Sequence, residues 1–177
     1  MFNTHEIRRI DELEDFLERT FISINVLIER RLFNQALIIM YSAIDTMAWS
    51  CRDIGDSDRN EFYAWCERHM PCEDLGITPM DLYAARCSML HSNSSHSNST
   101  ENGTSLPLHY VINPGSNSLQ NYAPATAQEW IVVDLQVLFD RFASATWEFR
   151  KRAMLIPRVR DVVSRRIERW LSFTTEE

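Results

Sequence analysis

The stretch DLYAARCSMLHS, residues 81–92, contains an arginine and a histidine within a mostly apolar run. Arg86 is permanently charged and presents a planar fork of N–H donors that suits anionic oxygens. His91 changes its charge near neutral pH, so it can accept and donate a proton. These two residue types can bind an anion and move a proton beside it, provided that the fold brings them together.

Arg86 occupies the middle of an apolar arc when residues 80–91 are projected on a helix of about 100° per residue. Leu82, Tyr83, Met89 and Leu90 flank it on that arc. A cation in a dry core is unfavourable by several kcal/mol unless it is paired. Arg86 is therefore expected to meet a buried acid, a subunit interface or a bound anion.

His91 projects about 140° away from Arg86, so one regular helix does not aim both groups at one atom. The two residue types converge if the helix frays at His91, or if two copies of it face each other across a dimer. Asp45 poses the matching question in the apolar run 36–49, because a carboxylate there also needs a partner. Arg86 is the expected partner.

The elements that position these residues are predicted to be helical. Apolar spacing and capping signals predict helices at about 4–30, 33–51, 61–70, 78–91, 126–154 and 158–172. Thr78 and Thr126 each begin a capping box. Residues 92–107 show no periodicity and are expected to form a flexible loop, followed by a short strand or a hairpin near 106–120. The prediction is a single all-α domain over 1–177, a bundle of about five to six helices.

Composition limits the classes of protein that remain. The N-terminus lacks the features of a signal peptide, and the most apolar window is too short and too acidic to span a membrane. The four cysteines form no C-x-x-C pair, which favours reduced thiols in the cytoplasm. No cluster of acids or histidines indicates a metal site, no glycine-rich phosphate loop or nucleophile elbow is present, and no cofactor is expected.

Charge is distributed unevenly along the chain, whose formal net charge is −7. Residues 150–170 hold eight basic and two acidic side chains, whereas the preceding part of the chain is strongly acidic. This asymmetry indicates either an anionic partner, bound through Arg165, Arg166 and Arg169, or an ordinary solvated face of a basic helix at 158–172.

The segment RCSMLH matches the Arg-x4–6-His motif of the HEPN superfamily, which consists of small all-α domains. Residues 30–95 resemble HEPN-like families of uncharacterised bacterial proteins in which LYxxRCxLxHS ends the motif helix, so Cys87 and Ser92 are supporting positions. Two departures stand out. Cys87 replaces the Asn or Asp often found in active members, and Asn93 replaces a tyrosine that one toxin subgroup modifies.

The resemblance implies a metal-independent endoribonuclease that works as a homodimer, with Arg86 and His91 as catalytic residues and Asp45 orienting Arg86. It also implies an RNA substrate and an antitoxin or phage-defence partner protein. The alternative is an inactive HEPN-like module that uses the same cleft to hold a nucleotide, RNA or a protein. The other histidines are expected on the surface or in loops, namely His5, His69, His96 and His109. Of these, His96 alone is a candidate to enter the cleft.

Overall fold

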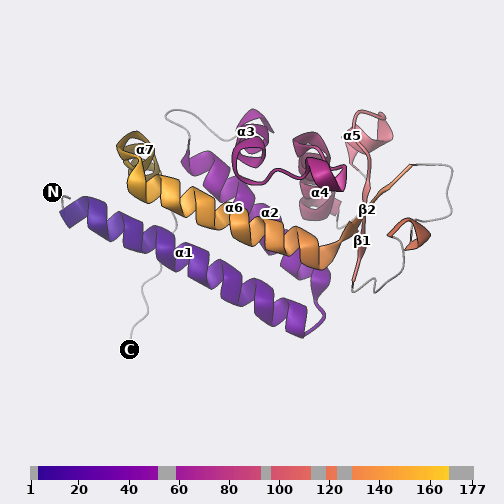
Figure 1. The fold of residues 1–177 in the computed structure, drawn as a ribbon, viewed down its shortest axis with the longest axis horizontal. Helices are drawn as coiled ribbons and strands as arrows, with labels where there is room; N and C mark the ends of the chain where they lie inside the picture. The colour runs from indigo at the N-terminus through magenta and orange to yellow at the C-terminus, as the bar shows by residue number, and fades with distance from the viewer. Residues whose placement is uncertain (1–3, 52–58, 93–96, 113–118, 123–128, 168–177) are drawn as a thin grey trace.

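The computed structural model describes residues 4–51, 59–92, 97–112, 119–122 and 129–167 (Figure 1). The elements, in chain order, are α1 (Thr4–Glu29), α2 (Phe33–Ser50), α3 (Arg59–His69), the 3-10 turn η1 (Glu73–Leu75), α4 (Pro79–Ser92), α5 (Asn98–Glu101), β1 (Leu108–Val111), the 3-10 turn η2 (Leu119–Tyr122), β2 (Ile131–Asp134), α6 (Leu135–Leu155) and α7 (Pro157–Ile167). The predicted all-α character is confirmed, with a two-stranded sheet added to it.

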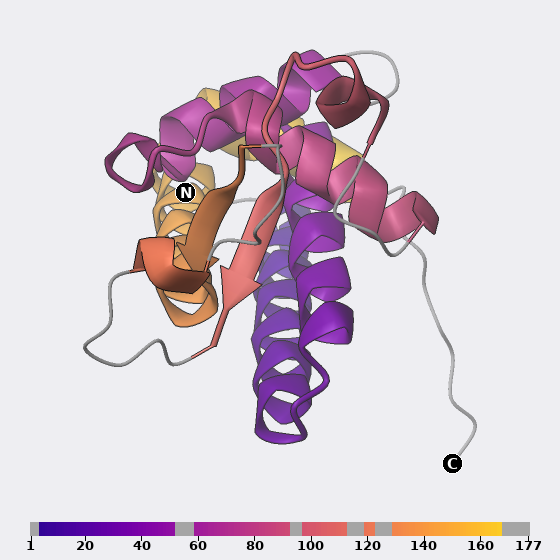
Figure 2. The ribbon, with the colours of Figure 1, turned by 90° about the vertical axis from the view of Figure 1, so that its right-hand side faces the viewer.

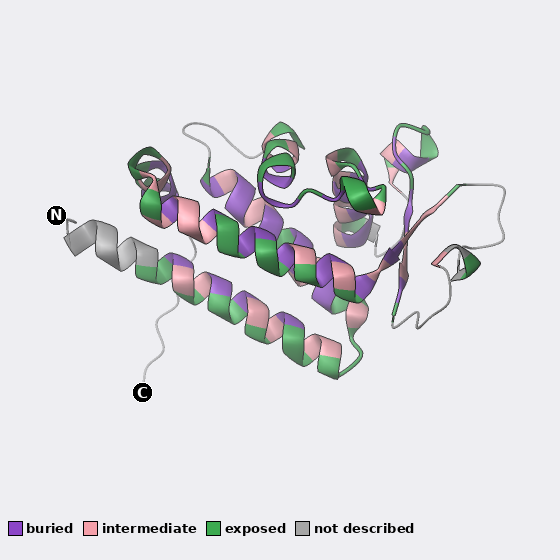
Figure 3. Ribbon diagram, in the orientation of Figure 1, coloured by how far each residue is buried: buried purple, intermediate pink, exposed green. Residues whose placement is uncertain are grey.

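Helix α2 is the centre of the bundle, as its apolar sequence predicts. It packs against α1, α3, α4 and α7, while α1 and α6 lie side by side across it (Figure 1). Met40, Tyr41, Ile44 and Met47 of α2 are completely buried. Figure 3 shows the contrast with α1, which alternates buried and exposed residues along the part whose burial is described. Helix α2 therefore provides the surface against which α3 and α4, the helices next to the candidate site, pack.

The start of α4 confirms the predicted capping box. The backbone N–H of Asp81 donates to Thr78 Oγ1 at 3.2 Å, and the backbone N–H of Thr78 donates to Asp81 Oδ2 at 2.9 Å. The Thr78 hydroxyl also donates to Asp81 Oδ2, at 2.6 Å. Asp81 is buried, and its second oxygen accepts the backbone N–H of Leu106 at 2.9 Å. One side chain thus fixes both the start of α4 and the approach to β1.

The sheet confirms the short strand predicted near 106–120, as opposed to the hairpin alternative, and corrects the predicted start of a helix. The expected strand near 106–112 forms as β1, but its partner is β2, which runs parallel to it, so the pair is not a hairpin (Figure 2). The helix expected from Thr126 begins instead at Leu135, where Asp134 Oδ1 accepts the backbone N–H groups of Gln136 and Val137. Residues 126–128 lie outside the described residues. The β-branched run at 131–133 favours a strand once a partner strand is available.

The interval 92–107 also contains a helix that the sequence analysis did not predict. Helix α5 is capped by Ser97, whose hydroxyl accepts the backbone N–H of Thr100 while the Thr100 hydroxyl accepts that of Ser97. Thr100 and Ser105 are buried. Short polar side chains therefore build a compact turn here without apolar periodicity. Residues 93–96 and 113–118, and the part of the predicted helix 158–172 that follows residue 167, lie outside the described residues.

Membrane insertion through a helix has no support in the described part of the chain. None of its helices is both long enough and apolar enough to cross a bilayer.

Candidate functional site

Arg86 and Asp45 form the ion pair that their sequence positions predict. Arg86 Nε donates to Asp45 Oδ2 at 2.6 Å, and Arg86 Nη2 lies 2.5 Å from the same oxygen. The pair joins α4 to α2. Each of the two side chains keeps 22% of its surface exposed, so the pair lies at the edge of the core and not in a dry interior. A ligand in solution can therefore reach it.

One aromatic ring of α4 lies against the Arg86 guanidinium, and two rings of α3 pack against that ring. The Arg86 guanidinium lies over the ring of Tyr83, 5.6 Å from its centroid. Tyr83 in turn meets the rings of Phe62 and Tyr63 edge to face, at 5.3 Å and 5.6 Å. From the sequence, Tyr83 is predicted only as an apolar neighbour of Arg86. Its position three residues before Arg86, on the same helical face, was the available signal.

The protonation of the pair reflects both burial and contact. Burial raises the pKa of Asp45, and the hydrogen bond and charge of Arg86 oppose that rise. The charge of His91 also lowers the pKa of Asp45. Burial alone would lower the pKa of Arg86, but the hydrogen bond and charge of Asp45, with smaller contributions from Cys87, raise it. Among the described residues, no hydrogen bond or ion pair joins His91 to the pair of Arg86 and Asp45.

His91 is exposed in the last turn of α4, and the helix continues to Ser92. Fraying at His91, one of the two expected routes to convergence, is therefore not seen. The side-chain placement of Ser92 is not described, and its supporting role stays a prediction. Cys87 is half-buried, and its Sγ lies 3.8 Å from Arg86 Nη1. Within one chain, the site consists of an oriented arginine and a histidine presented to solvent nearby.

His69 contradicts its prediction as a surface or loop residue. It is 7% exposed and packs against the rings of Trp65 and Phe149, with centroids 5.3 Å and 5.7 Å away. Burial, together with the nearby charges of Arg152 and Arg68, lowers the pKa of His69 to about 4. Its Nδ1 has no hydrogen-bond partner. His69, the last residue of α3, is thus a neutral core residue.

Of the remaining histidines, only His109 has a described side chain, and it makes no contact with the ion pair. His109 lies on β1, half-buried, with its ring 6.0 Å from that of Trp130. His96 and the side chain of His5 lie outside what is described, so entry of His96 into the cleft stays a prediction.

The C-terminal arginines separate into different environments. Arg166 is 4% exposed, and its guanidinium stacks on the ring of Trp49 at 4.7 Å from the centroid. This corrects its assignment to a phosphate-binding surface, because a buried, stacked arginine holds α7 against α2 and is not presented to a ligand. Arg165 is exposed. Arg169 lies outside the described residues.

Among the described residues, no three acids, histidines or cysteines cluster so that they could hold a metal ion. The cysteines there are all reduced. Cys66 and Cys72 are buried, and burial raises the pKa of both thiols, that of Cys72 to about 11. Thiols of such high pKa are poor nucleophiles at neutral pH.

Comparison of the chain with models of protein families, with curated proteins and with solved structures found no match.

Proposed function

We propose that this protein is a metal-independent endoribonuclease of the HEPN type that acts as a homodimer. One observation carries the proposal: a solvent-accessible arginine, oriented by a carboxylate from a neighbouring helix, lies on the same helix as an exposed histidine. This is the arrangement of Arg86, Asp45 and His91 that the resemblance implies.

The chemistry assigned to these residues is internal transesterification of RNA. The 2′-oxygen attacks the adjacent phosphorus as one His91 takes its proton, and the P–O5′ bond breaks as a second His91 donates a proton to the 5′-oxygen. The products are a 2′,3′-cyclic phosphate and a 5′-hydroxyl. Asp45 engages two of the five N–H groups of Arg86, so other N–H groups remain to stabilise the charge that develops on the phosphate oxygens.

The homodimer follows from the need for two histidines with different roles. In one chain, His91 lies away from the Arg86 side of α4, and a second copy of α4 would supply the missing partner. Sedimentation at micromolar concentration is expected to give twice the chain mass of 20.8 kDa. A clean monomer under cleavage conditions would contradict the composite site.

A non-catalytic binding module is the second candidate function. It is favoured by the same separation of His91 from Arg86, and by the fact that Asp45 already pairs with the guanidinium. In that case Arg86 locks α2 to α4 and contributes to a cleft for a nucleotide, RNA or a partner protein of a toxin–antitoxin or defence system.

Cleavage of labelled single-stranded RNA distinguishes the two candidates. His91→Ala should reduce the rate by about 100- to 10,000-fold, the usual contribution of a general acid–base residue. His109→Ala is the matched control, because it removes a half-buried imidazole on another element. EDTA should have no effect. If the wild-type dimer cleaves no RNA while it still binds RNA or a nucleotide, the binding module takes the place of the enzyme.

A further inference from the structure

Arg31 has a backbone conformation that is unusual for its residue type. Helix α1 ends in a Schellman motif, in which the N–H of Arg31 donates to Ile28 O at 2.9 Å and the N–H of Leu32 donates to Leu27 O at 2.8 Å. The motif places Arg31 at φ +57°, in the left-handed region. Glycine is the usual residue there, because a Cβ makes this conformation unfavourable by about 1 kcal/mol or more.

The other described residues with positive φ follow the usual pattern. They are Gly76, at φ +68°, and Gly103, at φ +70°. The protein therefore uses glycine where the backbone alone matters and departs from it at Arg31. Backbone strain of this kind at a non-glycine residue indicates that the side chain has a role.

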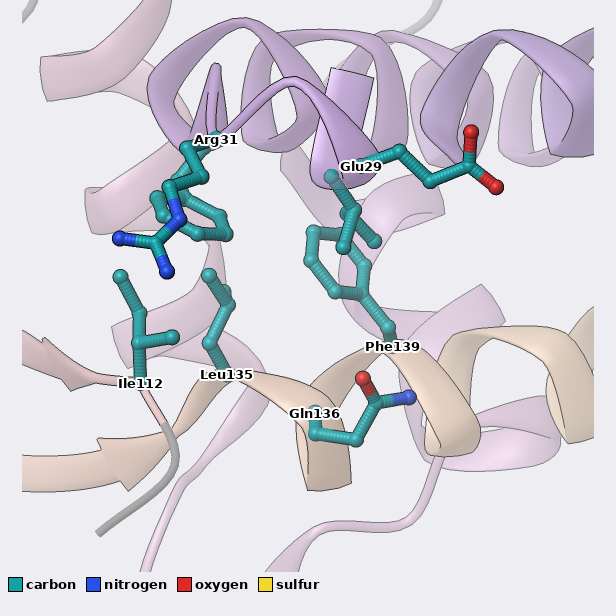
Figure 4. Close-up of a pocket in the computed structure, with 8 residues that line it drawn as sticks. Glu29, Arg31, Ile112, Leu135, Gln136 and Phe139 are labelled. Atoms are coloured by element: carbon teal, nitrogen blue, oxygen red, sulfur yellow. The ribbon is translucent and has the colours of Figure 1, made fainter. Parts of the chain in front are cut away.

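The Arg31 side chain lies at the mouth of a pocket of about 430 Å³, within the size range of small-molecule sites. Figure 4 shows the guanidinium directed toward Ile112 and Leu135, while the carboxylate of Glu29 points away from it. Among the described residues, no carboxylate pairs with Arg31. The charge of Arg31 is thus available to an anion.

The rest of the lining combines apolar side chains with one amide, Gln136, and with Glu29, whose carboxylate points away from Arg31 (Figure 4). The apolar side chains come from α1, α2, α6 and the end of β1, namely Ile28, Phe33, Ile112, Leu135 and Phe139. The Gln136 side chain donates through Nε2 to Asp140 Oδ1 at 3.0 Å, which fixes the amide. Its oxygen is turned toward the pocket (Figure 4). The pocket thus offers a cation at one side and a hydrogen-bond acceptor at another, with apolar side chains between them.

We propose that this pocket binds a small organic carboxylate with an apolar, planar body and one N–H or O–H donor. The guanidinium of Arg31 binds the carboxylate through paired hydrogen bonds. The apolar side chains cover the body of the ligand, and Gln136 Oε1 accepts from its donor. This site is distinct from Arg86 and His91, and the proposal does not depend on the proposed ribonuclease activity.

Indole-3-acetate is a suitable probe, because it combines a carboxylate, a planar apolar ring and one N–H. Titration of the full-length protein, followed by ¹H–¹⁵N NMR, should show saturable binding with a dissociation constant of about 1 mM or tighter, as expected for a ligand of this size. The Gln136 side-chain amide should shift. Indole-3-acetamide, which lacks the charge, and 1-methylindole-3-acetate, which lacks the N–H, should each bind about 10-fold more weakly.

Two arginine variants provide a matched comparison. Arg31→Gln should weaken binding about 10-fold or more, whereas Arg30→Gln removes the same charge from the adjacent exposed residue and should leave binding within about 2-fold of wild type. Arg31→Gly should also lose binding while its melting temperature rises, because the left-handed strain is relieved. Weaker binding together with a higher melting temperature would show that the ligand contact is lost while the fold is kept.

Several outcomes would overturn the proposal. They are the absence of saturable binding by the wild type, equal affinity for the acid and the amide, and equal weakening by Arg30→Gln and Arg31→Gln.

Discussion

The most informative single change in this structure is Arg86→Ala, because it removes one member of a pair whose other member, Asp45, is partly desolvated. Breaking a fully buried ion pair destabilises a protein by about 3–5 kcal/mol. Here each side chain is 22% exposed, so water can partly solvate the carboxylate left behind. We therefore expect a loss of about 2–3 kcal/mol in the free energy of unfolding at pH 7, or about 4–12 °C in melting temperature for a chain of this size.

The pH dependence of this loss identifies its cause. Burial already raises the pKa of Asp45 in the presence of Arg86, and removing the cation raises it further. A raised folded-state pKa means that the carboxyl favours the fold when it is protonated and disfavours the fold as pH rises through that pKa. The deficit of Arg86→Ala should therefore be full at pH 7 and shrink as pH falls toward the ordinary range of aspartate.

The double variant Arg86→Ala, Asp45→Asn tests the same reasoning without changing pH. It should regain about 1–2 kcal/mol of the loss at pH 7, because no charge remains to be desolvated, and its deficit should no longer depend on this carboxyl. Urea unfolding at pH 7 and pH 4.5 measures both effects. Arg141→Ala is the control, since its pair with Asp74 is mostly exposed and should contribute less than about 1 kcal/mol. A deficit that is unchanged at pH 4.5, or deepened by Asp45→Asn, would refute the account.

Three further changes have defined outcomes. Burial lowers the pKa of His69 to about 4, so the neutral imidazole favours the fold above pH 6.5. That contribution to stability, about 3 kcal/mol, is lost as pH falls toward 4. His69→Phe should therefore remove this part of the acid sensitivity, measured by urea unfolding at pH 7 and pH 4.5. Thr78→Ala should lower the free energy of unfolding by about 1 kcal/mol. Asp81→Ala should lower it by more, because the Asp81 carboxylate also accepts the backbone N–H of Leu106. Equal losses in thermal unfolding would contradict this double role of the carboxylate. Arg166→Gln should lower the melting temperature without changing the salt dependence of RNA binding. Arg165→Gln should reduce that salt dependence and leave the free energy of unfolding within about 0.5 kcal/mol of wild type. The reverse pattern would show that Arg166 contacts RNA.

Local signals in the sequence were sufficient for the helices that make up most of the fold. The apolar spacing of α1 and α2, the proline after α3 and the Thr78 capping box of α4 depend on residues within a few positions of one another. The pairing of Asp45 with Arg86 was also predictable, although the two residues lie 41 positions apart. Two charges on separate apolar arcs each need a partner, and each was the best partner available to the other.

Tertiary structure alone decided the features that depend on distant neighbours. Residues 131–134 are a strand because β1 lies beside them, and without that partner the sequence after Thr126 resembles the start of a helix. His69 is buried because Trp65 and Phe149 enclose it, and Arg166 is buried because Trp49 lies under its guanidinium. The sequence determined which residues favour helix and which charges need partners. Only packing determined which polar side chains the core would enclose, because burial is a property of the neighbours that the fold brings together.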